Sequence, residues 1–313
     1  MPSYKPVFSQ IVDPIGIAAD VRPRAMTRTT DESRAQTVQT TGGEPLVDFG
    51  GTSNPYIDYQ SIDLLLSLQH PRSDGYDEMC FFVMGQVKEL LFRGLHFELA
   101  NAQIQIRDSE IGNALIILQR AKTFVEYITR SWDVLSTITP EGFNQFRDHL
   151  GTASGQLSFM YRHIEFILGN KSRKLALAHR NVPHIWPAIK QALESPSLYD
   201  DTIRLLKRNG LPIESSALER DWSAPYEPNK SVEDAWLDVY RHGPGPDNHL
   251  YQLAETLVSI DDQMSQYRWR HFVSVHRIIG YKAGTGGSAG VEWLEHVTSL
   301  RFFPELWSVR TRL

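Results

Sequence analysis

The sequence has very little cysteine and no long apolar run. Cys80 is the single cysteine among 313 residues, so an intramolecular disulfide and any site that needs two cysteines of one chain are excluded. No run of about 18 apolar residues could span a bilayer, and the N-terminus lacks the basic-then-apolar pattern of a secretion signal. These absences favour a cytoplasmic protein without a membrane partner.

An excess of either charge is also lacking. The chain has 37 acidic and 32 basic residues and a formal net charge of -5. Neither sign forms a long run that could follow a phosphate backbone, so nucleic acid is not an expected partner. The chain does contain 41% hydrophobic residues, enough to bury a full core, while its length alone would suggest about two domains.

Apolar residues recur every three or four positions from Ile62 onward, which predicts amphipathic helices. The clearest stretches are "SIDLLLSLQ", "EMCFFVMGQVKELLFRGLHFELANAQI", "EIGNALIILQRAKTFVEYITRSWDVL", "GQLSFMYRHIEFILG" and "LYQLAETLVSIDDQMSQYRWRHFVSVHRIIG". No series alternates with the period of two that half-buried strands require. We therefore predict one all-α domain, a single helical bundle, over residues 49–313.

The segment before that domain has no periodic apolar face. Residues 1–48 include the polar, turn-rich stretch "TRTTDESRAQTVQTTGGEP". Such a composition is typical of a mobile tail or of an arm that binds a partner. We predict a flexible N-terminal tail, and its role stays open.

Several short signals mark predicted helix ends. Thr139 before Pro140 is typical of a helix start, Asn209-Gly210 of a helix end, and Ser231 with Asp234 of a capping box. The stretch from 211 to 246 contains five prolines, which predicts loops and one short helix around the helical core.

Two histidines, His271 and His276, lie near the end of the last long predicted helix. They are separated by about 140° around the helix, so they cannot form one two-histidine metal site. His271 shares its face with Met264, Tyr267, Val275 and Ile278, which predicts that it points inward. The spacing leaves two interpretations open, a packed core histidine or a ligand. The following loop, "KAGTGGSAG", lacks the lysine pattern of a phosphate-binding loop.

Five segments together resemble the tryptophan 2,3-dioxygenase family. They are "YIDYQSIDLLLSLQ", "DEMCFFVMGQVKEL", "GQLSFMYRHIEFILGNK", "RHFVSVHRIIGYKAGTGGSAG" and the ending "FFPELWSVRTRL", and the match runs from about residue 49 to the C-terminus. The resemblance implies an all-helical homotetramer that binds haem b and dioxygen. It implies insertion of oxygen across indole carbons 2 and 3 of L-tryptophan, which gives N-formylkynurenine.

The resemblance also implies roles for three polar residues. His271 is similar to the family's proximal ligand of the haem iron, and a neutral imidazole there leaves the other side of the iron for dioxygen. Arg162 matches the arginine that pairs with the amino-acid carboxylate, although an intrahelical pair with Glu165 is the alternative. Thr285 matches the threonine that contacts the ammonium and carboxylate of the substrate.

Three aromatic residues are further implied to bind substrate. Phe81 matches an aromatic that packs against the indole. Tyr56 and Tyr59 match two tyrosines that a neighbouring subunit contributes to the pocket. Without the resemblance, all three would be ordinary core or interface aromatics.

Two positions depart from the family pattern. The distal catalytic histidine, next to the indole nitrogen, is replaced by Gly85, and the family tryptophan after "EL" is replaced by Leu91. Glycine inside a helix costs about 1 kcal/mol relative to alanine. Gly85 is either drift at a dispensable position or a residue that leaves room for water or for a bulkier tryptophan.

We therefore predict a haem b-dependent oxygenase that acts at the indole C2–C3 bond of L-tryptophan or of a substituted, for example methylated, tryptophan. The favoured interpretation is a monooxygenase of secondary metabolism. The first alternative is a housekeeping tryptophan 2,3-dioxygenase that forms N-formylkynurenine. The second is a non-catalytic sensor of haem and tryptophan.

Overall fold

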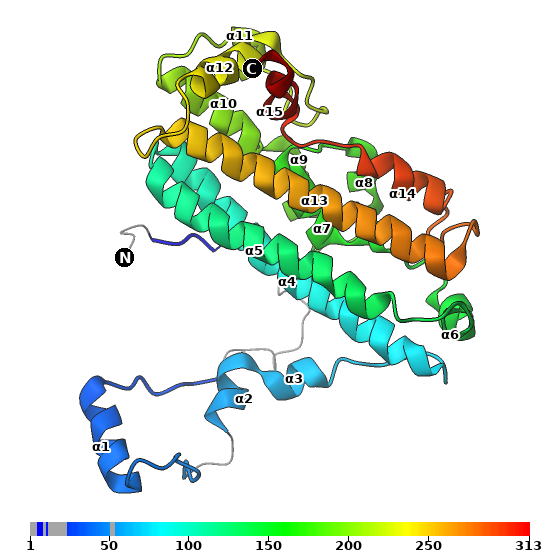
Figure 1. The fold of residues 1–313 in the computed structure, drawn as a ribbon. Coiled ribbons are helices and arrows are strands. Elements are labelled where there is room, and N and C mark those ends of the chain that lie inside the picture. Colours follow the sequence, from blue (N-terminus) through cyan, green and yellow to red (C-terminus); the bar gives the residue numbers. More distant parts are fainter. Residues whose placement is uncertain (1–4, 9–10, 12–23, 51–53) are drawn as a thin grey trace. The chain divides into compact units, whose positions relative to one another are not determined.

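The computed structural model describes residues 5–8, 11, 24–50 and 54–313 (Figure 1). These ranges contain helices, turns and loops and no β-strand, which confirms the predicted all-α class. The α-helices are α1 (Asp31–Thr41), α2 (Pro55–Gln60), α3 (Ile62–Leu66), α4 (Tyr76–Arg107), α5 (Ile111–Leu135), α6 (Pro140–Phe146), α7 (Phe159–Leu168), α8 (Arg173–Ala176), α9 (Trp186–Glu194), α10 (Leu198–Arg208), α11 (Ser215–Leu218), α12 (Lys230–Arg241), α13 (His249–Ile279), α14 (Val291–Thr298) and α15 (Pro304–Ser308). None of the helices in the described ranges is long and apolar enough to cross a bilayer.

Contacts divide the chain into two compact units. One unit is residues 14–70, and the other combines residues 1–13 with residues 71–313. This division differs from the predicted tail, residues 1–48, and domain, residues 49–313. The mobility of the tail stays a prediction.

The unit of residues 14–70 contains α1, α2 and α3, none of which has a buried residue. Thr30 begins α1 by accepting a hydrogen bond from the backbone N–H of Ser33 at 3.2 Å. The guanidinium of Arg24 pairs with Asp58 at 3.2 Å and with Asp63 at 2.7 Å. Among the described residues of this unit, local caps and exposed ion pairs, rather than an apolar core, therefore provide the contacts.

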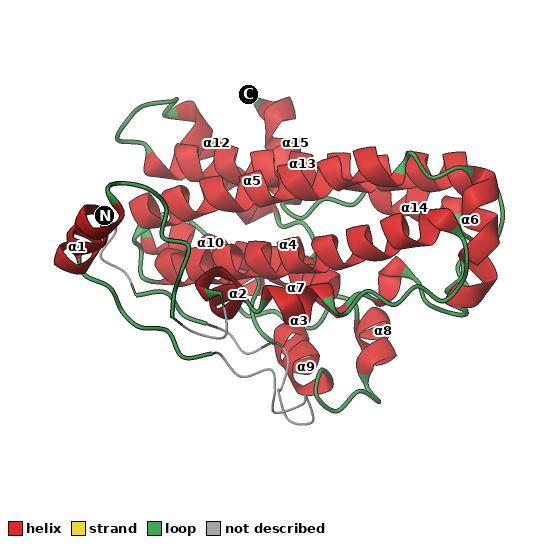
Figure 2. Cartoon of the chain, turned by 90° about the horizontal axis from the view of Figure 1, so that it is seen from below, coloured by secondary structure: helices red, strands yellow, loops and turns green. Residues whose placement is uncertain are grey.

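Three long helices, α4, α5 and α13, form the centre of the larger unit (Figures 1 and 2). α5 packs against both α4 and α13. Its buried residues are spaced by three or four positions, as the sequence pattern predicts. They include Ala114, Ile117, Leu118, Ala121, Val125, Ile128, Trp132 and Leu135.

α4 differs between its two halves. In residues 92–107, the closed half, most inward side chains are fully buried, and α7 and α10 pack against the helix. In residues 76–91, the open half, Glu78 alone is buried. The closed half contains Gly94, where a Cβ would lie 2.5 Å from Cε1 of Phe124, so glycine permits the close approach of α4 and α5.

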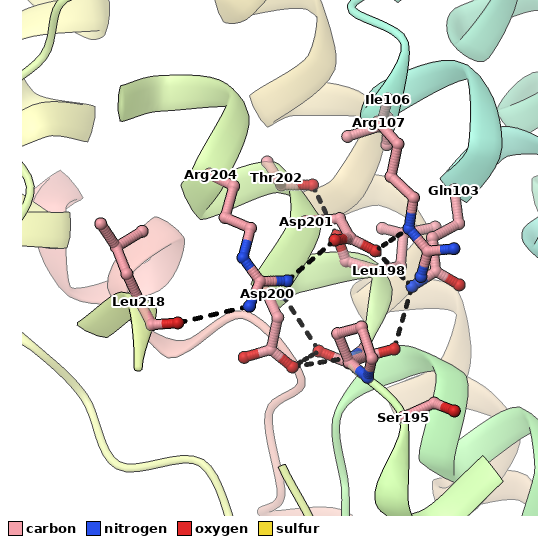
Figure 3. Close-up of polar contacts among 12 residues, drawn as sticks. Gln103, Ile106, Arg107, Ser195, Leu198, Asp200, Asp201, Thr202, Arg204 and Leu218 are labelled. Carbon is pink, nitrogen blue, oxygen red and sulfur yellow. Dashed lines mark hydrogen bonds and ion pairs between the residues drawn. The ribbon is translucent and has the colours of Figure 1, made fainter. Parts of the chain in front are cut away.

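A buried carboxylate fixes the closed half to α10 (Figure 3). Oδ2 of Asp201 accepts hydrogen bonds from Nε2 of Gln103 at 2.7 Å and from Nε of Arg107 at 2.6 Å. Its Oδ1 accepts from the guanidinium of Arg204 at 3.1 Å. These charge-assisted contacts satisfy both oxygens of Asp201, which is 3% exposed.

Residues 5–8 lie against the closed half although they belong to the predicted tail. The backbone N–H of Val7 donates to Oδ1 of Asn101 at 2.8 Å, and Nδ2 of Asn101 donates to the carbonyl of Val7 at 3.1 Å. The rings of Phe8 and Phe97 have centroids 5.1 Å apart. This short segment is therefore attached to α4.

The C-terminal segment is attached to α13 through Asp261, which is fully buried. Its Oδ2 accepts hydrogen bonds from the backbone N–H groups of Phe302 and Phe303 and from Nε1 of Trp307, at 3.0, 3.3 and 2.9 Å. Three donors on one carboxylate oxygen offset the cost of burying the charge.

Two of the predicted helix ends are confirmed. Thr139 accepts a hydrogen bond from the backbone N–H of Gly142 at 2.9 Å, with Pro140 in the first turn. Asn209 is the C-cap of α10, and Gly210 follows with a φ of 86°, which glycine adopts without strain.

The capping box predicted at Ser231 is wrong, because Asn229 caps α12 instead. Oδ1 of Asn229 accepts from the backbone N–H of Ser231 at 2.9 Å, while Asp234 pairs with Lys230 at 2.6 Å. The helix thus begins two residues earlier than predicted. The stretch from 211 to 246 also contains two helices, α11 and α12, rather than one.

Candidate functional site

His271 lies on α13 and faces the interior of the bundle, as its helical position predicts. Its ring stacks on that of Trp132, with centroids 4.5 Å apart and planes at 15°. Burial, and then the positive charge of Lys88, lower the pKa of His271 to about 3. The low pKa keeps the ring neutral. No described residue forms a hydrogen bond with the imidazole, so its nitrogens are available for a ligand.

His276 lies in a different environment. Its ring centroid is 5.9 Å from that of Phe272 and 4.9 Å from that of Tyr281. These neighbours are distinct from those of His271, so the two histidines serve separate places, as their spacing predicts.

An aromatic cluster surrounds the Trp132–His271 stack. Tyr267 lies 6.4 Å from His271 and 6.2 Å from Trp132, measured between ring centroids. Tyr161 and Phe92 extend the cluster toward α7 and α4, at 5.9 and 6.1 Å from Tyr267. Within the described ranges the buried Nε1 of Trp132 has no hydrogen-bond partner, so this apolar region contains an unused donor.

Lys88, on the open half of α4, was missed by the sequence analysis. Its Nζ lies 3.9 Å from the centroid of the Trp132 ring, a cation–π contact. Burial lowers the pKa of Lys88 to about 8, although the charge of Glu89 opposes this shift. The usable signal was its position three residues after Gly85, on the same helical face.

Gly85 and Phe81 also lie on the open half of α4. A Cβ built at Gly85 would meet no atom within 4 Å, so this side of the helix has free space. The ring of Phe81 is held between helices, with its centroid 6.1 Å from Phe143 and 5.3 Å from Phe146 of α6.

Arg162, on α7, is 2% exposed. Its guanidinium pairs with Glu165 and donates to the carbonyl of Gln156 at 3.2 Å. The pair that the sequence analysis gave as the alternative role is therefore present. Nε of Arg162 is buried and has no hydrogen-bond partner among the described residues, so a donor is left for a ligand.

The glycine-rich loop packs on the segment that precedes α7. The hydroxyl of Thr285 donates to the carbonyl of Ala153 at 2.6 Å, and Nε2 of Gln156 donates to the carbonyl of Gly286 at 3.2 Å. A Cβ at Gly286 would lie 2.6 Å from Cβ of Ser154, so the close approach requires glycine. Because Gln156 also accepts from Arg162, the structure brings Arg162 and the Thr285 loop to one segment.

Tyr56 and Tyr59 lie on α2 and are 63% and 76% exposed. They belong to the unit of residues 14–70. Their contribution to the pocket of a neighbouring subunit stays a prediction.

A surface hollow of about 640 Å³ lies at the start of α4 and is lined by residues 71–75, Gln145 and His149. None of the candidate residues lines it. The candidate site is instead the region of His271, Trp132 and the open half of α4.

Comparison with known proteins identifies the family. The profile described as Tryptophan 2,3-dioxygenase matches residues 42–183 and 239–313. The tryptophan 2,3-dioxygenase of Shewanella woodyi is 44% identical over 260 residues, which cover 82% of this chain and 90% of that protein. Tryptophan 2,3-dioxygenase 1 of Ralstonia nicotianae is 43% identical over 263 residues, which cover 83% of this chain and 88% of that protein. The chain belongs to the tryptophan 2,3-dioxygenase family.

Tryptophan 2,3-dioxygenases are haem enzymes, and this member is a haem-dependent oxygenase. The residues present fit the cofactor. His271 offers a neutral imidazole without a competing hydrogen bond, and the described residues contain no cluster of three or more His, Cys, Asp or Glu that could hold a bare metal ion. The names of the relatives support the ring-cleaving dioxygenase alternative better than the favoured interpretation, monooxygenation of a substituted tryptophan.

Proposed function

We propose that the chain is a haem b-dependent dioxygenase that inserts both atoms of dioxygen across the indole C2–C3 bond of L-tryptophan. The product is N-formylkynurenine. The observation that carries the proposal is the unpartnered imidazole of His271, stacked on Trp132 in a chain whose relatives are named tryptophan 2,3-dioxygenases. When bound, haem supplies the iron at which dioxygen is activated.

The side chains of this protein would hold and orient the reactants. His271 would bind the iron through its neutral imidazole. Arg162 has the unpaired Nε for a carboxylate oxygen, and its guanidinium is already fixed by Glu165. Thr285 lies in the loop that Gln156 connects to Arg162, so ammonium and carboxylate contacts would arise at one end of the substrate. Phe81 would pack against the indole.

Reaction under isotopically labelled dioxygen tests this proposal. The haem-loaded, reduced protein is incubated with L-tryptophan, and the product mass is measured. Two labelled atoms in one product molecule are the expected result. One labelled atom would replace dioxygenation by monooxygenation, and binding of tryptophan without oxygen consumption would indicate a sensor.

A second candidate concerns the substrate. The free space at Gly85, where a Cβ meets nothing within 4 Å, favours a substituted tryptophan such as a methylated one. Gly85→His should then lower kcat/KM for the methylated substrate by about 10 to 200-fold, because one methyl group in a binding site is worth about 1 to 3 kcal/mol. Unsubstituted tryptophan should lose less. Equal losses for both substrates would remove the support for this candidate.

The proposal includes a homotetramer in the cytoplasm, with Tyr56 and Tyr59 reaching a neighbouring subunit. The exposure of both tyrosines leaves their rings free for such a contact. Light scattering after size-exclusion chromatography gives the mass in solution. A monomer with full activity would exclude a shared pocket.

A further inference from the structure

Lys88 presents a cation at the candidate haem site that forms no ion pair with a described residue, although the charge of Glu89 acts on it from further away. Its Nζ lies 3.9 Å from the centroid of the Trp132 ring. No described residue accepts a hydrogen bond from this ammonium group or lies within ion-pair distance of it. A cation–π contact provides about 0.5 to 2 kcal/mol, less than the loss of water around a partly buried ammonium group.

A second unpaired donor lies beside it. Nε1 of Trp132 is buried and has no acceptor among the described residues. The same indole ring is stacked on His271. The ammonium group of Lys88 and the N–H of Trp132 are thus two donors at one indole ring, and this ring stacks on the proposed iron ligand. A carboxylate has two oxygens and could accept from both donors.

We propose that Lys88 is the positioning residue that pairs with a carboxylate of the haem, with Nε1 of Trp132 as the second donor. This inference rests on the proposed function, since it requires haem b beside His271. Haem b has two propionate carboxylates, so the partner that Lys88 lacks is part of the cofactor itself. The ion pair would hold the bound haem in one orientation.

The carboxylate of the amino-acid substrate is the other group that could pair with Lys88. Arg162 provides a donor for that group, and it is linked through Gln156 to the Thr285 loop. Lys88 contacts the ring that is stacked on His271 instead. The neighbours of the two cations therefore assign the haem carboxylate to Lys88 and the amino-acid carboxylate to Arg162.

The test compares two haems in the full-length protein freed of haem. Ferric haem b and its dimethyl ester, in which both carboxylates are esterified, are titrated into the protein, and affinity is read from the Soret band and from tryptophan fluorescence. Lys88→Met should weaken haem b binding about 10 to 100-fold, as expected for loss of a charged hydrogen bond. It should leave the affinity for the dimethyl ester unchanged. Lys88→Arg should retain tight binding of haem b.

Lys122→Met is the matched control, because Lys122 lies on α5 and already forms an ion pair with Glu126 at 4.0 Å. It should leave both affinities unchanged. Equal losses for haem b and the ester on Lys88→Met would show that Lys88 is structural and overturn the inference, as would no loss for either. If Lys88→Met does not fold, Lys88→Gln, which is polar but lacks the charge, is titrated with both haems in its place.

Three outcomes separate the possible sources of failure. If Lys88→Met retains haem b affinity but weakens L-tryptophan binding without affecting tryptamine, which lacks the carboxylate, Lys88 binds the substrate and the haem assignment is overturned. If the wild-type protein binds neither haem, the proposed function itself fails. If wild-type and Lys88→Met bind haem b equally, the assignment of Lys88 alone fails.

Discussion

The two halves of α4 have the same secondary structure but opposite surroundings. The closed half, residues 92–107, is packed by α5, α7 and α10 and is tied to Asp201. The open half, residues 76–91, has one buried residue, Glu78, and carries Phe81, Gly85 and Lys88. One half thus stabilises the fold, while the other presents side chains with space or unused hydrogen-bonding capacity. The difference shows where a cofactor and substrate can be bound without disrupting the core.

Substitution of Arg162 has the largest expected effect. This residue is buried like those that pack the closed half of α4, yet it is predicted to bind substrate like those of the open half. Arg162→Leu should lower the free energy of unfolding by about 3 to 5 kcal/mol, since Glu165 loses its closest partner. The remaining contacts of Glu165 with Arg268 at 3.5 Å and Asn170 at 3.1 Å favour the lower end. Denaturant unfolding gives this value.

The binding role of Arg162 is measured separately. In the same variant, affinity for L-tryptophan should fall far more than affinity for an indole that lacks the carboxylate. Arg162→Lys keeps the charge and serves as the control for stability. Equal losses for the two ligands would leave Arg162 with a structural role only.

The second prediction concerns His271, the proposed iron ligand on α13. His271→Ala should weaken haem binding by more than about 100-fold, because even a residue that only supports a metal ligand contributes about 10 to 100-fold. His276→Ala should retain haem, since His276 packs with Phe272 and Tyr281. Haem titration followed by the Soret band measures both. An unchanged spectrum in His271→Ala would refute the assignment of the ligand.

The smallest expected effects come from two glycines on the same helix. Gly94→Ala should destabilise the protein by about 1 to 3 kcal/mol, because the new methyl group would meet the ring of Phe124 at 2.5 Å. Thermal or denaturant unfolding of the protein without haem measures the change.

Gly85→Ala is the matched control for Gly94→Ala. It adds the same methyl group to α4 where nothing lies within 4 Å, so it should stabilise the protein by up to about 1 kcal/mol. Opposite signs for the two substitutions would confirm the contrast between the halves. The same sign for both would mean that the two halves do not differ in packing at these glycines.

Local pattern was sufficient for much of the fold. The spacing of apolar residues predicted α4, α5, α7 and α13, and it placed His271 on the inward face of α13. The cap at Thr139 was equally local, since a threonine needs only a backbone N–H three residues away. The cap of α12 was misplaced because Asn229 and Ser231 have similar capping chemistry, and the choice between them depends on contacts outside the helix. Ser231 has such a contact, accepting a hydrogen bond from the backbone N–H of Glu214.

The resemblance to the family supplied candidate roles that periodicity could not. It singled out Arg162, Thr285 and Gly85, and the structure then showed that Arg162 and the Thr285 loop meet at Gln156. It did not point to Lys88, because a lysine on a helix is ordinarily solvated, and its spacing of three residues from Gly85 does not by itself indicate burial.

The sequence by itself determined which segments are helical and which face of each is apolar, because helix periodicity depends on residues only three or four positions apart. Only the tertiary structure decided which residues of other helices contact each helix face. Gly85 and Gly94 are the same residue type on one helix, yet only Gly94 lies against a ring from α5. Likewise, Lys88 and His271 come from distant segments and share the ring of Trp132. Such contacts depend on how helices pack across the bundle, and no local pattern records that arrangement.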